Sequence, residues 1–211
     1  MATSATTSTS GPSDSQTSSS PAPAPAPTPA AYAEARRTRP SVIGDDAGLS
    51  HEQGKTYPIY LRGDVQKGFG RGGKELGCAT ANLPSSVFDP PSKLTETGVY
   101  FGYASVDLDA ETGGAKDGGV WPMVMSVGWN PFYKNEQKTA EVHIMHEFQH
   151  DFYGKHMKVV VLGYIRPEFN YVSREALIED IETDKQVGLR SLDRPAWSAY
   201  KQDSFFAEHA S

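Results

Sequence analysis

The chain has 211 residues, a formal net charge of −6 at pH 7 and a single cysteine. The lone cysteine excludes a disulfide framework and a cysteine-based zinc site, and the longest apolar run, residues 159–162, is too short to span a membrane. The acidic balance disfavours a general nucleic-acid binder, so we expect small-molecule partners.

The N-terminal quarter differs in composition from the rest of the chain. Residues 1–50 hold 7 of the 15 prolines and no Trp, Phe or Cys, and 13 of the first 20 residues are Ser or Thr. Such a segment buries too little apolar surface to offset its ordering entropy, so we expect residues 1–50 to be a disordered tail. Its late arginines, which we expect to form no amphipathic helix, favour a solvated linker over a transit peptide. Residues 51–211 are then one domain.

Most of this domain has the pattern of β-strands separated by Gly and Pro. The predicted strands cover residues 57–65, 98–108, 121–129, 141–148 and 158–166. The AETGGAKDGG segment before the third strand is predicted to be a flexible hairpin loop. Short links between successive strands predict an antiparallel meander that forms a small barrel or sandwich. One face of the third strand is predicted to carry Trp121, Met123, Met125, Val127 and Trp129.

The C-terminal segment changes to helical spacing. Ser173 is a suitable N-cap and Pro195 ends the segment. We expect the helix to pack across one opening of the barrel. Its apolar positions are Leu177, Ile178, Ile181, Leu189 and Leu192.

A glycine cluster at residues 68–74, GFGRGGK, has the character of a phosphate-binding loop. Glycines let backbone N–H groups approach phosphates, and Arg71 and Lys74 supply positive charge. The letters match both GxGxxG and the start of GxxxxGK, but Glu75 stands where a P-loop needs Ser or Thr. A loop without a ligand is the alternative.

Thr80 and Asn82 follow this loop. If the backbone is extended, both side chains point to the same side. Their neutral oxygens suit a Mg²⁺ ion that keeps waters and binds substrate phosphates. The alternative is a turn with local side-chain caps.

The stretch from Glu141 to His150 permits two interpretations. On a helix, His143, His146 and His150 would be spaced to bind zinc. The apolar alternation of the stretch instead favours a strand, which puts His143 and His146 on opposite faces. Glu141, at the start of that strand, is a candidate general base, and a solvated surface carboxylate is the alternative.

The last predicted strand ends at Arg166-Pro167-Glu168 and is followed by Phe169 and Tyr171. An arginine with aromatic rings at a barrel mouth can hold a planar ring. Strand-end capping and core packing explain the same residues equally well.

Together these motifs resemble the eukaryotic riboflavin kinase (flavokinase) family, in order and with similar spacing, from about residue 57 to the end. The resemblance implies a mainly β fold, a six-stranded antiparallel Greek-key barrel with a C-terminal α-helix. It also implies an ATP:riboflavin 5′-phosphotransferase that makes FMN and ADP with a divalent ion. The segments that carry it are GFGRGGKELGCATANLP, GVYFGYASV, VGWNPFYKN, AEVHIMHEFQHDFYGK and VVVLGYIRPEFNY.

The resemblance also implies roles for individual residues. Glu141 falls at the catalytic position, and Thr80 and Asn82 at the positions that hold Mg²⁺, with Zn²⁺ as the alternative ion. Ala79 replaces the proline of the family's Pro-Thr-Ala-Asn motif, which puts the stiffness of the loop in doubt but not the ligands. The nucleotide is expected to contact Gly68, Gly70, Arg71, Gly72, Lys74, Ile144, His146 and Tyr153. The flavin is expected to contact Arg166, Phe169 and Tyr171.

Three other functions are alternatives to riboflavin phosphorylation. A bifunctional enzyme that also makes FAD needs a nucleotidyltransferase domain, which residues 1–50 cannot supply. A non-catalytic flavin-binding barrel would have lost Glu141 or the Thr80 and Asn82 pair. The third is the histidine-based zinc binder. We expect an intracellular, cytoplasmic monomer without nucleic-acid partners or a transmembrane segment, with mitochondrial or membrane association as the alternative location.

Overall fold

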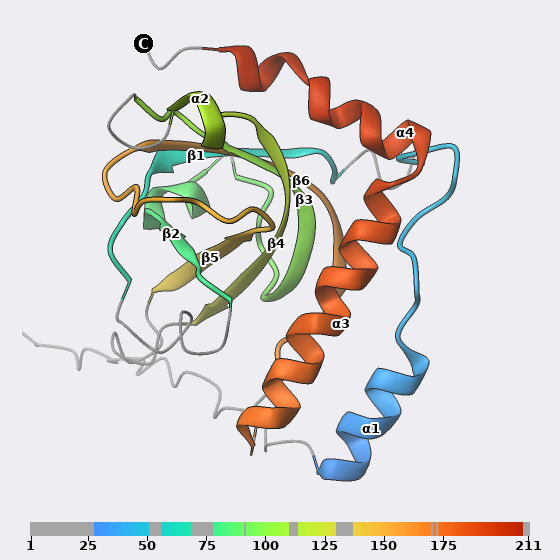
Figure 1. Cartoon of the computed structure of the whole chain (residues 1–211). Helices are drawn as coiled ribbons and strands as arrows, with labels where there is room; N and C mark the ends of the chain where they lie inside the picture. Colours follow the sequence, from blue (N-terminus) through green and yellow to red (C-terminus); the bar gives the residue numbers. More distant parts are fainter. Residues whose placement is uncertain are drawn as a thin grey trace, which may run out of the picture.

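The computed structural model describes residues 28–50, 56–68, 78–90, 92–109, 114–129, 137–169, 171 and 173–208, without the side chains of residues 29, 32, 115 and 116. Strands dominate the described part, and one long helix follows them (Figure 1). The strands are β1 (Ile59–Asp64), β2 (Ala81–Leu83), β3 (Gly98–Val106), β4 (Val120–Trp129), β5 (Lys138–Ile144) and β6 (His156–Arg166). The helices are α1 (Pro29–Thr38), α2 (Gly114–Asp117), α3 (Arg174–Leu192) and α4 (Pro195–Ser198), with 3₁₀ turns η2 (Ser85–Phe88), η5 (Ala199–Gln202) and η6 (Ser204–Ala207).

The strands form one six-stranded antiparallel sheet in the order β1-β6-β3-β4-β5-β2. The sheet curls until its two edges meet, where the backbone N–H of Gln66 donates to the carbonyl of Asn82 at 2.8 Å. β3, β4 and β5 form a meander and β6 returns beside β3, which is a Greek key. The expected Greek-key barrel with a C-terminal helix is confirmed, whereas the simple meander is wrong at β6.

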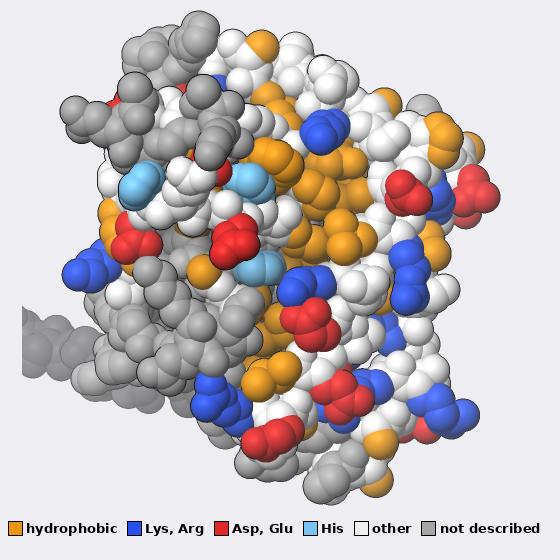
Figure 2. Space-filling model, viewed as in Figure 1, with side chains coloured by type: hydrophobic (Ala, Val, Ile, Leu, Met, Phe, Trp, Pro, Cys, Tyr) orange, Lys and Arg blue, Asp and Glu red, His pale blue; other side chains and the backbone are white. Residues whose placement is uncertain are grey.

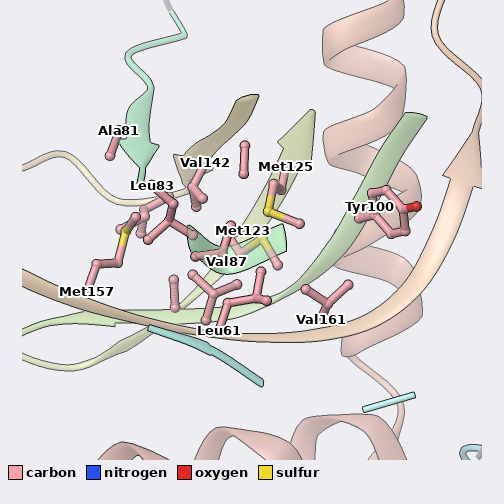
Figure 3. Packing of buried hydrophobic residues seen from close by; sticks show 14 of the residues in the cluster. Leu61, Ala81, Leu83, Val87, Tyr100, Met123, Met125, Val142, Met157 and Val161 are labelled. Atoms are coloured by element: carbon pink, nitrogen blue, oxygen red, sulfur yellow. The ribbon is translucent and has the colours of Figure 1, made fainter. Parts of the chain in front are cut away.

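The interior of the curled sheet is filled from all sides by side chains at every second strand position. Leu61, Leu83, Met125, Val142 and Val161 come from five different strands and point into one cluster (Figure 3). The predicted inward face of β4 is confirmed by three of its members, which are 0% exposed: Met123, Met125 and Val127.

The outer face of β3, β4 and β6 is also covered. Phe101 and Val160 point outward and join an apolar cluster with Val187 and Leu192 of α3, and Figure 1 shows α3 standing along this side of the sheet. The prediction that the helix closes a barrel opening is therefore wrong. Its predicted start is confirmed, because the Ser173 hydroxyl accepts from the backbone N–H of Ala176 at 3.1 Å.

Residues 28–50, here called the N-terminal arm, pack against the domain. The arm begins with α1 beside α3 (Figure 1). It then passes Ile43, which contacts the outer apolar cluster, and Gly44, which lies against the Trp197 ring. Residues 28–50 therefore have a packed structure in place of the expected disordered tail, and Arg36 and Arg37 lie in α1. Residues 1–27 lie outside the described residues.

Two predicted segments have different local structure. β5 ends at Ile144 instead of Phe148, because the buried carboxylate of Asp117 binds the His146 ring and the backbone N–H of Gln149 and draws the chain out of the sheet. Asp117 itself ends α2, which occupies part of the predicted hairpin loop. Among the described residues, none of the helices combines the length and apolarity needed to cross a bilayer.

Candidate functional site

A row of polar side chains crosses three neighbouring strands on the outside of the barrel. Glu141 of β5 is directly opposite Asn82 of β2 on one side and Ser126 of β4 on the other. Facing residues on adjacent antiparallel strands have Cβ atoms about 5 Å apart and share a face. The row therefore places a carboxylate between an amide and a hydroxyl, each within reach of one small ligand group.

The expected phosphate and metal residues border this row at the β2 end. A Cβ atom on Gly68 would lie 2.5 Å from the Asn82 Nδ2 atom, so the backbone at Gly68 lies directly against the Asn82 amide, which a side chain here would displace. Thr80 immediately precedes β2 and is half-buried. The other predicted phosphate-loop residues lie outside the described residues: Gly70, Arg71, Gly72 and Lys74.

Glu168 joins the row from the β4 side, and sequence reasoning gave it no role. Its carboxylate lies over Gly128, where a Cβ atom would come within 2.3 Å of Oε1, and the Ser126 hydroxyl donates to Oε1 at 3.4 Å. Burial raises the pKa of Glu168 and the Glu141 carboxylate adds to the rise, while Ser126 and Arg166 oppose it. Asn82, Ser126, Glu141 and Glu168 together are called the outer-face site.

The expected flavin residues lie together next to Glu168. Arg166, which ends β6, forms a two-pronged ion pair with Asp184 of α3, with Nε and Nη2 3.0 and 2.8 Å from Oδ2. Its guanidinium carbon is 5.0 Å from the Phe169 ring centre and 6.0 Å from that of Tyr171. The fork fixes the plane of the guanidinium, which makes it a rigid platform beside two rings.

Residues of α3 face the outer-face site from a third side. Burial raises the pKa of the Cys78 thiol to about 11; nearby Lys185 opposes the rise, and Glu182 and Glu141 add to it. Burial also lowers the pKa of His143, whose Nδ1 lies 2.8 Å from the carbonyl oxygen of Ala79. The residues before β2 are thus held between β5 and α3.

The predicted nucleotide residues downstream of Glu141 lie elsewhere. His146 stacks on Trp121 with ring centres 3.9 Å apart and bonds to Asp117 at 3.0 Å. Trp121 is five residues along β4 from Ser126, or about 16 Å from the row. Tyr153 lies in an exposed turn. The Ile144 side chain is in the barrel core, so only its backbone can reach a ligand.

Figure 2 shows a band of hydrophobic side chains along the junction of the barrel with α3, with histidine and acidic side chains beside it on the barrel. Val120 and Met145 border the outer cluster here, and Leu189 of α3 is exposed. The surface next to the polar groups is therefore suited to an aromatic or apolar part of a ligand.

The oxygen donors near the row suit a hard cation that is completed by phosphates and water. Thr80 and Asn82 supply neutral oxygens, which fits Mg²⁺ better than a dedicated protein cage. Within the described ranges, no three His, Cys, Asp or Glu side chains form a metal-binding group. His143 and His146 have different partners, Ala79 and Asp117, which does not support the three-histidine zinc site.

Comparison with known proteins gives a consistent result. Residues 55–192 match the family model described as flavokinase, riboflavin kinase. The chain is 46% identical over 166 residues to a riboflavin kinase of Pyricularia oryzae, covering 75% of this chain and 81% of that protein. It is 45% identical over 149 residues to the riboflavin kinase of Homo sapiens, covering 71% and 90%. The crystal structure of riboflavin kinase from Trypanosoma brucei superposes with a TM-score of 0.56 at 28% identity, covering 73% of this chain and 92% of that one.

Proposed function

The chain belongs to the riboflavin kinase family, and we propose that its outer-face site transfers the γ-phosphoryl group of ATP to the 5′-hydroxyl of riboflavin. The observation that carries this assignment is the position of Glu141. It lies between Asn82 and Ser126, with the expected metal residues on one side and the Arg166 cluster beyond Glu168 on the other. The 5′-hydroxyl of riboflavin, held at Glu141, would thus lie between the flavin ring and the phosphates of ATP.

In this reaction the ribityl oxygen forms a bond to the γ-phosphorus while the bond to the ADP oxygen breaks. Glu141 orients the hydroxyl and accepts its proton. Thr80 and Asn82 would hold a Mg²⁺ ion, and the ion would supply positive charge for the phosphate oxygens. Gly68 and the glycine-rich segment after it approach the phosphates, with Arg71 and Lys74 as countercharges.

The two substrates are assigned to opposite sides of the row. Arg166, with Phe169 and Tyr171, contacts the flavin ring. His146, Tyr153 and the backbone of Ile144 contact the nucleotide. Activity as a monomer is part of this proposal.

The direct test is conversion of riboflavin by the purified full-length protein. With ATP and Mg²⁺ we expect FMN and ADP to form in equal amounts, measured by chromatography. Omission of the divalent ion should abolish turnover, and replacement by Zn²⁺ measures the preference between the two. Binding of riboflavin without ATP-dependent FMN formation would instead support the non-catalytic flavin-binding barrel.

A further inference from the structure

Two buried carboxylates on α3 connect the N-terminal arm with the proposed flavin residues. Asp180 and Asp184 are one helical turn apart and therefore share a face, and their side chains are 0% and 3% exposed. Their positive partners come from two directions. From β6, Arg166 pairs with Asp184. From the arm, Arg36 pairs with Asp180, and Arg39 pairs with both carboxylates.

Arg39 bridges the two carboxylates. Its Nη2 donates to Asp180 Oδ1 at 2.7 Å and its Nη1 to Asp184 Oδ1 at 3.0 Å. The Arg39 side chain is only 3% exposed. Because Asp184 also accepts the fork of Arg166, one carboxylate is shared between an arginine of the arm and the arginine of the flavin side.

Asp180 carries the same connection to the aromatic part of the cluster. Burial opposes its ionisation, but hydrogen bonds from Arg36 and Arg39, with the Tyr171 hydroxyl close by, outweigh burial and hold the pKa of Asp180 below its ordinary value. Tyr171 therefore lies close to the carboxylate that Arg39 neutralises. Its ring lies beside the Arg166 guanidinium.

We propose that the N-terminal arm is a positioning element of the flavin site, in which Arg39 fixes Arg166 and Tyr171 through Asp184 and Asp180. The inference rests on the proposed flavin role of Arg166. Without Arg39, Asp184 keeps only Arg166 and Asp180 keeps only Arg36, so the bridge between the two carboxylates is lost. Asp184 is then held from one side only, and the Arg166 guanidinium is less firmly fixed beside the Phe169 ring.

The test compares variants of the full chain at a temperature well below their melting points. Arg39→Ala should weaken riboflavin binding, followed by flavin fluorescence, by about tenfold or more, equivalent to about 1.4 kcal/mol. The KM for MgATP should stay within about twofold of wild type. Arg39→Lys keeps the charge but loses the two-carboxylate fork, so it should show a smaller loss.

The matched control is Arg37→Ala on the same helix, because Arg37 is 75% exposed and pairs only with Glu34 among the described residues. It should leave both substrates unaffected. In Arg39→Ala, a loss of riboflavin affinity with an unchanged KM for MgATP separates positioning from simple destabilisation.

The outcomes distinguish this inference from the proposed function. A wild-type chain that makes no FMN contradicts the proposed function. An active wild type with unchanged riboflavin affinity in Arg39→Ala, whether or not the melting temperature falls, overturns the positioning role. If Arg39→Ala does not fold, Arg39→Lys decides, because unchanged riboflavin affinity there equally overturns it.

Discussion

Two acidic regions of the molecule, one on α3 and one on the barrel beside it, treat their charges in opposite ways. In the arm junction, Asp180 and Asp184 are almost fully buried and each contacts at least two arginines. In the outer-face site, burial is the main cause that raises the pKa of Glu168, and the nearby Glu141 carboxylate raises it further. Matched buried charges fix a structure, whereas a carboxylate whose pKa is raised by burial and by a second carboxylate is typical of sites that move protons.

The largest effect on stability is expected in the arm junction. Asp184→Ala leaves Arg166 and Arg39 without their shared carboxylate, and breaking a buried pair in this way costs about 3–5 kcal/mol of unfolding free energy. Urea unfolding monitored by tryptophan fluorescence measures the change. The control is Glu182→Ala on the same helix, at an exposed carboxylate that pairs with Lys185, so its loss should be below about 1 kcal/mol. Equal losses in both variants would remove the distinction between the regions.

The next effect is expected at the metal side of the outer-face site. Asn82→Ala removes an oxygen donor beside Gly68, so the Mg²⁺ concentration for half-maximal activity should rise by about tenfold, equivalent to about 1.4 kcal/mol. Riboflavin affinity should change little. Ser86→Ala in the neighbouring exposed turn serves as the control. An unchanged Mg²⁺ requirement in Asn82→Ala would remove Asn82 from the metal site.

The two regions also differ in how far the sequence predicts them. The polar row depends on period-two alternation, so the sides of Asn82 and Glu141 follow from the residues alone. The pairing of Ser126 with Glu141 depends on the register between two strands, which local spacing does not determine. The position of Glu168 depends on the path of the chain after β6, which brings it over Gly128 and is equally absent from local spacing.

The arm was missed because composition was averaged over residues 1–50. Its order comes from Arg36 and Arg39 contacting carboxylates some 140 residues away, and composition carries no signal for such pairing. The position of α3 on the outside of the sheet, in contrast, has a signal in the pattern of β3. β3 is buried at all nine positions, and strands buried on both faces indicate a layer on the outside of the sheet.

A smaller effect should appear in the acid stability of the arm junction. The pKa of Asp180 is lowered from 3.8 in the folded chain, so its contribution is complete above that pH and is lost as the pH falls through the folded value. Urea unfolding at decreasing pH below about 4 should therefore show a shallower fall for Asp180→Asn than for wild type. Asp46→Asn, at a carboxylate 94% exposed, should follow the wild type. A slope unchanged in Asp180→Asn would contradict the assignment.

The smallest effect is expected from the segment before the arm. The described contacts of the arm begin at Thr28, which caps α1, and the composition of residues 1–27 predicts little burial. A chain that begins at Thr28 should keep kcat and both KM values within about twofold of the full chain. Removal of residues 1–50 should instead weaken riboflavin binding, and full riboflavin affinity in that shorter chain would argue against a role of the arm.

The role proposed for Glu141 is chemical and not structural: it accepts the proton of the riboflavin hydroxyl, and the fold does not need it for stability. Its most direct test is the single-turnover rate of FMN formation in Glu141→Gln, with ATP, Mg²⁺ and riboflavin all saturating. General-base catalysis predicts a fall of about 10²–10⁴-fold, with melting temperature and substrate affinities near wild type. Glu147→Gln, at an exposed position six residues along, should keep most of the rate. Equal rates in the two variants would contradict the account.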